Sequence, residues 1–143
     1  MTWGEIQKIS LEKMFAKDEP IEVDDIEDLK EDDDCRWYLS AMPGVCNEAI
    51  ERLKPYVMNI YEYDEEEKKY NKVKIDHVTY ETEPDTVINL PDDTCVLIPL
   101  YIASQLYKDD DIALATQYRN EFEVGLQDLL YNIENQESIN EVY

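Results

Sequence analysis

The C-terminal third of the chain carries a stripe of apolar residues with the period of an α-helix. The stripe advances in steps of three and four residues, and its members are Ile112, Ala115, Tyr118, Phe122, Leu126, Leu129 and Ile133. Residues at these steps lie on one face of a helix, so this segment is expected to pack that face against a core. At 1.5 Å per residue the helix spans about 33 Å, close to the width of a small domain. The polar tail, 134–143, is expected to be frayed.

Two segments toward the N-terminus also have helical signals. The first is 3–15. Thr2 just before it and Glu5 in its first turn have capping-box spacing, so each side chain can accept a hydrogen bond from a backbone N–H at the helix start. The second, 35–54, keeps its apolar phase across the proline and glycine at 43–44. That continuity predicts a kinked helix rather than two separate helices.

A further helix is expected over 94–107, and this segment is apolar almost all round. Asp93 or Thr94 could cap its start, and Pro99 either kinks it or marks a later start. A helix without a polar face is buried on all sides, and in a chain this short we expect a neighbouring subunit to supply part of that burial. The residues expected at this subunit interface are Leu97, Tyr101, Ile102 and Tyr107.

The middle of the chain is rich in β-forming residues that alternate with charged ones. The alternation slips near Asp76 and His77, which predicts a β-bulge there. The expected strands lie at 57–63, 72–81 and, more briefly, 86–90, with a connecting loop at 64–71. The expected fold class is therefore mainly α (α+β). A four-helix core forms one domain over 1–143, with a small antiparallel β-sheet inserted at 57–90 between the second and third helices.

The chain is strongly acidic, with 35 Asp and Glu residues against 13 Lys and Arg residues and a net charge of -22 over 143 residues. A surface this acidic repels nucleic acid and anionic membranes, so basic surfaces, cations or copies of the chain itself are the expected partners. The acids are densest at 18–34, which is expected to be a long loop or a short helix that partly docks on the body. Its candidate functional residues are Asp24, Asp25, Glu27 and Asp28.

No catalytic, cofactor-binding or metal-binding residue is predicted. The single histidine, His77, is expected at the surface, and its neighbours match no nucleophile motif. The three cysteines have no zinc-ligand spacing, and an odd number without a CxxC pair fits a reducing compartment. The acidic runs at 31–34 and 109–111 lack the glycine of a calcium loop and are expected to cap helices. Only three glycines are present, so no phosphate-binding loop is expected. The N-terminus lacks a basic region followed by an apolar run, and no apolar stretch approaches about 20 residues, so neither a signal peptide nor a membrane span is expected. The protein is expected not to be an enzyme.

Three segments resemble a known family. They are 42–50 (MPGVCNEAI), 98–110 (IPLYIASQLYKDD) and 115–123 (ATQYRNEFE). They resemble the head-tail connector, or head-completion adaptor, proteins of tailed bacteriophages and prophages. The resemblance implies a ring of identical subunits beneath the portal, with the portal and other neck proteins as partners. It places the protein in the virion neck, and in the bacterial host cytoplasm during assembly.

In such a ring DNA passes without specific binding. Carboxylates that face the channel repel its phosphates, and the acidic stretch 18–34 suits either this lumen or an outer loop. The alternative function is an acidic DNA mimic that inhibits a DNA-binding enzyme by occupying its basic groove. The charge supports both alternatives equally, but the acids concentrate in loops rather than along one helical face. Sizing distinguishes them, because a connector forms rings or binds a portal, whereas a mimic stays small.

Overall fold

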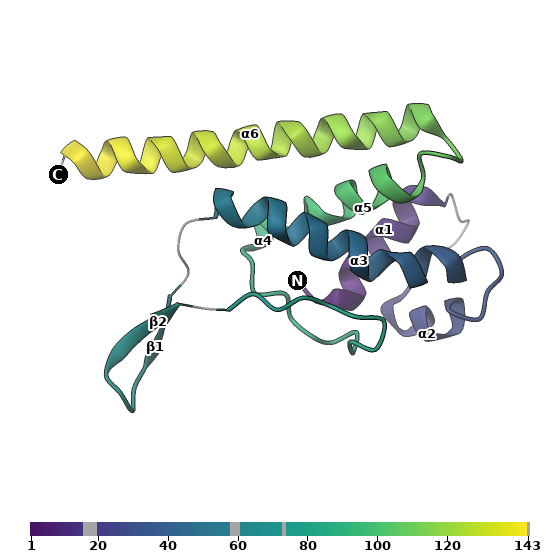
Figure 1. Ribbon diagram of the computed structural model, residues 1–143, viewed down its shortest axis with the longest axis horizontal. Helices are drawn as coiled ribbons and strands as arrows, with labels where there is room; N and C mark the ends of the chain where they lie inside the picture. Colours follow the sequence, from purple (N-terminus) through teal and green to yellow (C-terminus); the bar gives the residue numbers. More distant parts are fainter. Residues whose placement is uncertain (16–19, 58–60, 73, 143) are drawn as a thin grey trace.

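The computed structural model describes residues 1–15, 20–57, 61–72 and 74–142. Most of this chain is helical, and the only sheet among the described residues is a two-stranded hairpin (Figure 1). The predicted class, mainly α with a small antiparallel sheet between the second and third long helices, is confirmed. The long helices are α1 (Trp3–Met14), α3 (Arg36–Leu53), α5 (Ile98–Leu106) and α6 (Ile112–Val142), the short ones are α2 (Ile26–Leu29) and α4 (Asp92–Cys95), and the strands are β1 (Tyr61–Asp64) and β2 (Lys69–Lys72).

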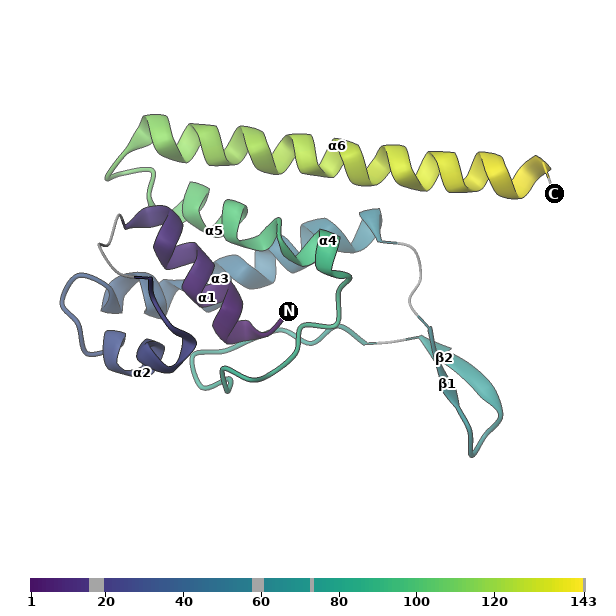
Figure 2. The same ribbon diagram turned by 180° about the vertical axis from the view of Figure 1, so that it is seen from behind.

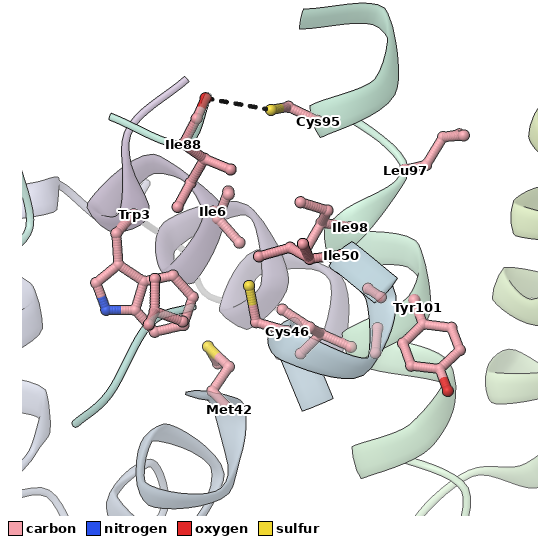
Figure 3. Close-up of a cluster of buried hydrophobic side chains, with 14 of the residues drawn as sticks. Trp3, Ile6, Met42, Cys46, Ile50, Ile88, Cys95, Leu97, Ile98 and Tyr101 are labelled. Atoms are coloured by element: carbon pink, nitrogen blue, oxygen red, sulfur yellow. Dashed lines mark hydrogen bonds between the residues drawn. The ribbon is translucent and has the colours of Figure 1, made fainter. Parts of the chain in front are cut away.

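Helix α5 lies at the centre and contacts α1, α3 and α6. Helix α6 runs along one side of the molecule in both views, and the hairpin projects away from the helical body (Figures 1 and 2). The core forms between these helices, because each buries its apolar stripe against α5. Its fully buried members converge from α1, α3 and α5 (Figure 3), and they include Trp3, Ile6, Met42, Ile50 and Ile98.

The start of α1 is held by the loop that precedes α4. The first N–H groups of a helix lack partners within it. Here the backbone N–H groups of Trp3 and Gly4 donate to the carbonyl oxygens of Thr86 and Pro84, each at 2.8 Å. The predicted capping box is half confirmed. The Thr2 hydroxyl oxygen accepts from the Glu5 N–H at 3.2 Å, but the Glu5 carboxylate accepts from the Thr2 hydroxyl rather than from its backbone.

The strand prediction was partly wrong. The hairpin of β1 and β2 contains the whole segment expected to be the connecting loop, 64–71, of which only 65–68 is the turn. Of the strand expected at 57–63, residues 61–63 are confirmed in β1, and residues 58–60 lie outside the described residues. Residues 74–79 form no strand, and without a paired strand there is no bulge at His77. The strand at 86–90 is reduced to one bridge, between Val87 and Thr2.

An asparagine on α3 holds the irregular segment after β2. Asn47 Nδ2 donates to the carbonyl oxygen of Val78 at 2.9 Å, and the Val78 N–H donates to Asn47 Oδ1 at 2.8 Å. The side-chain amide thus replaces a strand partner for Val78, whose side chain is buried. Because the backbone groups of Val78 are hydrogen-bonded to Asn47, they do not require a neighbouring strand.

Replacing Asn47 by alanine should lower the free energy of unfolding by about 1–3 kcal/mol, because two partly buried backbone groups lose their partners. The segment after β2 should also become more sensitive to limited proteolysis. Urea unfolding followed by circular dichroism measures the first effect. Asn89→Ala is the control, since it removes one exposed bond of 3.5 Å and should change stability by less than about 0.5 kcal/mol. Equal effects of the two variants would contradict this assignment.

Two helical expectations near the C-terminus are corrected. The helix expected at 94–107 is divided into α4 and α5, and Pro99 lies in the first turn of α5, so it marks a later start. Asp93 and Thr94 cap neither helix, because Pro91 precedes α4 and the Thr94 hydroxyl donates to Asp93 at 3.3 Å. Helix α6 continues to Val142, so the tail expected to be frayed is helical over 134–142.

Gly44 and Gly125 both lie inside long helices, but they should respond oppositely to alanine. Nothing lies within 4 Å of a Cβ added at Gly44, which is exposed, so Gly44→Ala should stabilise by about 0.5–1 kcal/mol through helix propensity. A Cβ at Gly125 would stand 2.4 Å from Leu97 Cδ2. Gly125→Ala should therefore destabilise by about 1–2 kcal/mol through overpacking. Thermal unfolding of the two variants should shift in opposite directions, and shifts of one sign would refute the packing at these sites.

Candidate functional site

The residues expected at a subunit interface are mostly buried within the chain itself. Leu97, Tyr101 and Ile102 are 8%, 6% and 0% exposed, and Tyr107 is half-buried. Their burial comes from α1, α3 and α6 packing around α5. The reason for expecting a neighbouring subunit at this helix therefore does not hold. Of the four, only Tyr107 retains substantial surface.

Tyr101 instead anchors a polar cluster that joins three helices. Its hydroxyl donates to Glu48 Oε2 on α3 at 3.2 Å, and its ring contacts Phe122 of α6 with centroids 5.1 Å apart. The guanidinium groups of Arg52 and Arg119 each lie 5.6 Å from the ring centroid. Both arginines also pair with one carboxylate oxygen of Glu123, at 3.4 and 3.0 Å. The two rings are buried, whereas Arg52, Arg119 and Glu123 are partly exposed, and their cation–π and ionic contacts link α3 to α6 beside the Tyr101 ring.

Four aromatic rings from three distant segments meet at one end of the helical body. This aromatic patch consists of Phe15 after α1, Trp37 and Tyr38 on α3, and Tyr107 after α5. The Tyr38 ring lies 5.2 Å from Phe15, 5.0 Å from Trp37 and 6.3 Å from Tyr107, centroid to centroid. Trp37 is 57% exposed. Exposed tryptophan on a rigid helix, backed by half-buried rings, is typical of a protein-binding surface.

One carboxylate contacts the aromatic patch, and others lie close to it in sequence. The Tyr38 hydroxyl donates to Asp110 Oδ2, which ties α3 to the turn before α6. Burial first, and this hydrogen bond second, raise the pKa of Tyr38 above its ordinary value. Asp33 and Asp109 are exposed nearby, and Arg36, paired with Asp33 at 3.6 Å, is the basic residue next to Trp37 in sequence. An aromatic surface with an acidic rim suits a basic partner, whose arginines can stack on the rings and pair with the acids.

One of the two helix caps predicted at this end is confirmed. Asp111 Oδ1 accepts from the Leu114 N–H at the start of α6, at 3.0 Å, and so satisfies an unpaired helix N–H group. The run at 31–34 does not cap α3 through a side chain. Asp32 Oδ1 instead accepts from the N–H groups of Asp34 and Cys35, at 2.8 and 3.2 Å, in the turn before the helix.

The acidic stretch docks partly on the body, as expected. Its short helices are Val23–Asp25 and α2, and Ile26 is fully buried beneath them while Ile21 is 5% exposed. Asp18 lies outside the described residues. The four candidate acids of this stretch are exposed, although one side-chain oxygen of Asp25 accepts from the Glu22 N–H and Glu27 pairs with Lys30 at 3.0 Å. These exposed acids are Asp24, Asp25, Glu27 and Asp28.

The single histidine, His77, pairs with a nearby carboxylate. His77 is a surface residue, as predicted, and its Nε2 lies 2.7 Å from Glu51 Oε1. Hydrogen bonds from Lys54 and then His77 lower the pKa of Glu51. Over the described residues, no three or more His, Cys, Asp or Glu side chains are placed to hold a metal ion. Within the same part of the chain, no helix combines the length and apolar character needed to cross a bilayer.

Sequence reasoning missed the aromatic patch, apart from Tyr107. Its rings come from segments more than 20 residues apart, and each ring alone matches an ordinary helix position. The one available signal was the adjacent pair Trp37 and Tyr38, because only one of two consecutive helix residues can face the core squarely. Comparisons of the chain with protein-family models, with curated proteins and with solved structures found no match.

Proposed function

We propose that the chain is a structural protein of the head-tail junction of tailed bacteriophages or prophages. In this role it is a connector that forms a ring beneath the portal and lets DNA pass. The supporting observation is that the three segments resembling connector proteins meet in one packed unit. They lie on α3, α5 and α6, where Tyr101 contacts both Glu48 and Phe122. The resemblance therefore covers a coherent part of the core rather than scattered positions.

The distribution of charge is compatible with this role. A channel wall through which DNA moves must not hold phosphates, and exposed carboxylates repel them. The candidate acids of the acidic stretch are exposed and attached to the body by Ile26, so they are presented on an ordered surface. The aromatic patch is a separate feature, suited to a basic surface of a neighbouring protein such as the portal.

Co-expression with the portal protein of the phage or prophage that encodes the chain tests the proposal. We expect the two to co-purify and to show rings by negative-stain electron microscopy. Trp37→Ala should weaken portal binding by about thirtyfold or more if the patch is central to the contact. Tyr70→Ala is the matched control, because Tyr70 is an exposed aromatic residue on the hairpin, 71% accessible, outside the patch.

Two other results would reject the connector. A small, salt-sensitive complex with a DNA-binding enzyme, in competition with DNA, would establish the mimic instead. If the folded protein forms no complex with the portal at any salt concentration, both the ring and the location in the neck are rejected.

A further inference from the structure

Helix α6 has a second face that the core does not use. Six positions follow one another in steps of four, three, four, three and four residues, and the structure leaves all of them exposed. Two of them, Ala113 and Tyr131, are each nine positions from the buried Phe122, which at about 100° per residue places them on the opposite side of the helix. This outer stripe consists of Ala113, Gln117, Asn120, Val124, Gln127 and Tyr131.

The outer stripe carries no charge, although 34% of the residues in this chain are charged. The charged residues of α6 between 112 and 132 are Arg119, Glu121, Glu123 and Asp128, and none is a stripe position. Val124 and Tyr131 remain 60% and 63% exposed. The surface over the first half of the stripe is hollowed by an open depression of about 520 Å³. It is lined by Ala113, Gln117, Asn120 and Val124 of the stripe and by Thr116 and Glu121 beside it.

The stripe has the same spacing in both directions. Ala113 and Tyr131, Gln117 and Gln127, and Asn120 and Val124 are placed symmetrically about Phe122. When two such helices pair antiparallel about a twofold axis at this point, Ala113 of each copy faces Tyr131 of the other. A small residue then meets a large one, the ring can enter the depression, and two glutamine side chains meet across the seam. The alternating steps of four and three residues are also those of a helix–helix seam.

We infer that the outer stripe of α6 joins two copies of this chain in an antiparallel pair. The net charge of the chain indicates that a second copy binds at the outer stripe rather than elsewhere on the surface. Each copy carries -22, so two copies repel wherever acids meet, and an uncharged face lets them approach with the least repulsion. Salt should favour the pair, because screening over about 8–10 Å weakens the residual repulsion.

This pairing is independent of the proposed function. A twofold contact uses the same surface on both copies and closes at two, whereas a ring requires two different surfaces. Size measurements on the isolated protein test the pair, and portal binding tests the connector. Either can fail without the other.

Light scattering coupled to size exclusion, across salt and protein concentration, provides the first test. We expect the mass to rise toward twice 16.9 kDa as either increases. Val124→Glu should raise the dissociation constant of the pair by about thirtyfold or more, because each copy then brings an unpaired carboxylate into the seam, where the two like charges repel. Asn132→Glu is the matched control, since it adds the same charge to an exposed position of α6 outside the stripe and should change the constant by less than about threefold. Circular dichroism verifies that both variants remain folded.

Cysteine crosslinking tests the orientation. Ala113→Cys mixed with Tyr131→Cys should form a disulfide-linked heterodimer, whereas Ala113→Cys alone should not. In the antiparallel pair two copies of position 113 stand 18 residues apart along the seam, or about 27 Å. Crosslinking of Ala113→Cys to itself would show a parallel pair and overturn the inference. A parent protein that stays monomeric at every salt and protein concentration, or a dimer unaffected by Val124→Glu, would also overturn it.

Discussion

Phe122→Ala is expected to lower the free energy of unfolding by about 3–5 kcal/mol, because a fully buried ring is lost and a cavity remains. Phe122 is 0% exposed, its ring lies 5.1 Å from that of Tyr101, and the Arg52 guanidinium stands 5.4 Å from its centroid. Removing the ring therefore affects the contacts of α6 with both α5 and α3. Urea unfolding followed by circular dichroism measures the change.

Ile112→Ala is the control for this prediction. It shortens an apolar side chain on the same helix that is 69% exposed and lies outside the outer stripe, and it should change stability by less than about 0.5 kcal/mol. Leu106→Ala, at a position on α5 that is 8% exposed, should cost about 2–5 kcal/mol. If Phe122→Ala unfolds at the same urea concentration as the parent, α6 does not pack on the core through this face.

The long helices were predictable because each carries a sustained apolar stripe. Phe122, Leu126 and Leu129 were expected in the core and are buried there. Burial was predicted less accurately for residues at the ends of the apolar stripes. Leu100, within the segment 94–107 that was expected to be buried on all sides, is only half-buried, and Ile112, expected to start the stripe of α6, is 69% exposed. A stripe fixes which face is buried, but where burial begins depends on which neighbour covers each turn.

The strands expected at 72–81 and 86–90 were placed wrongly, because β-forming composition does not determine the partner. The residues near Val78 satisfy their backbone through Asn47 on α3, and those near Thr86 through the start of α1. Both partners are distant in sequence and neither is a strand, so no local pattern could indicate them. The aromatic patch was missed for the same reason, since Phe15, Trp37 and Tyr107 become neighbours only after the helices pack.

Raising the pH above 9 should destabilise the fold through Cys46. Its thiol is 0% exposed, and burial first, then the nearby Cys95, raises its pKa from an ordinary value of 9.0 to about 12. Below pH 9 the thiol is protonated in both states and its contribution to stability is complete. Between pH 9 and about 12 only the unfolded chain loses the proton, so stability falls by about 1.4 kcal/mol for each pH unit, or about 4 kcal/mol in all.

Urea unfolding at a series of pH values from 8 to 11 measures this slope. Cys46→Ala should start from a lower stability, because the side chain fills core space, but it should lose less stability between pH 9 and 10 than the parent. Tyr38→Phe is the comparison. The pKa of Tyr38 is raised from 10.0 by burial and by its bond to Asp110, so its contribution is lost only as the pH rises above 10. A parent and a Cys46→Ala variant with the same slope between pH 9 and 10 would show that this thiol ionises as readily in the folded chain as in the unfolded one.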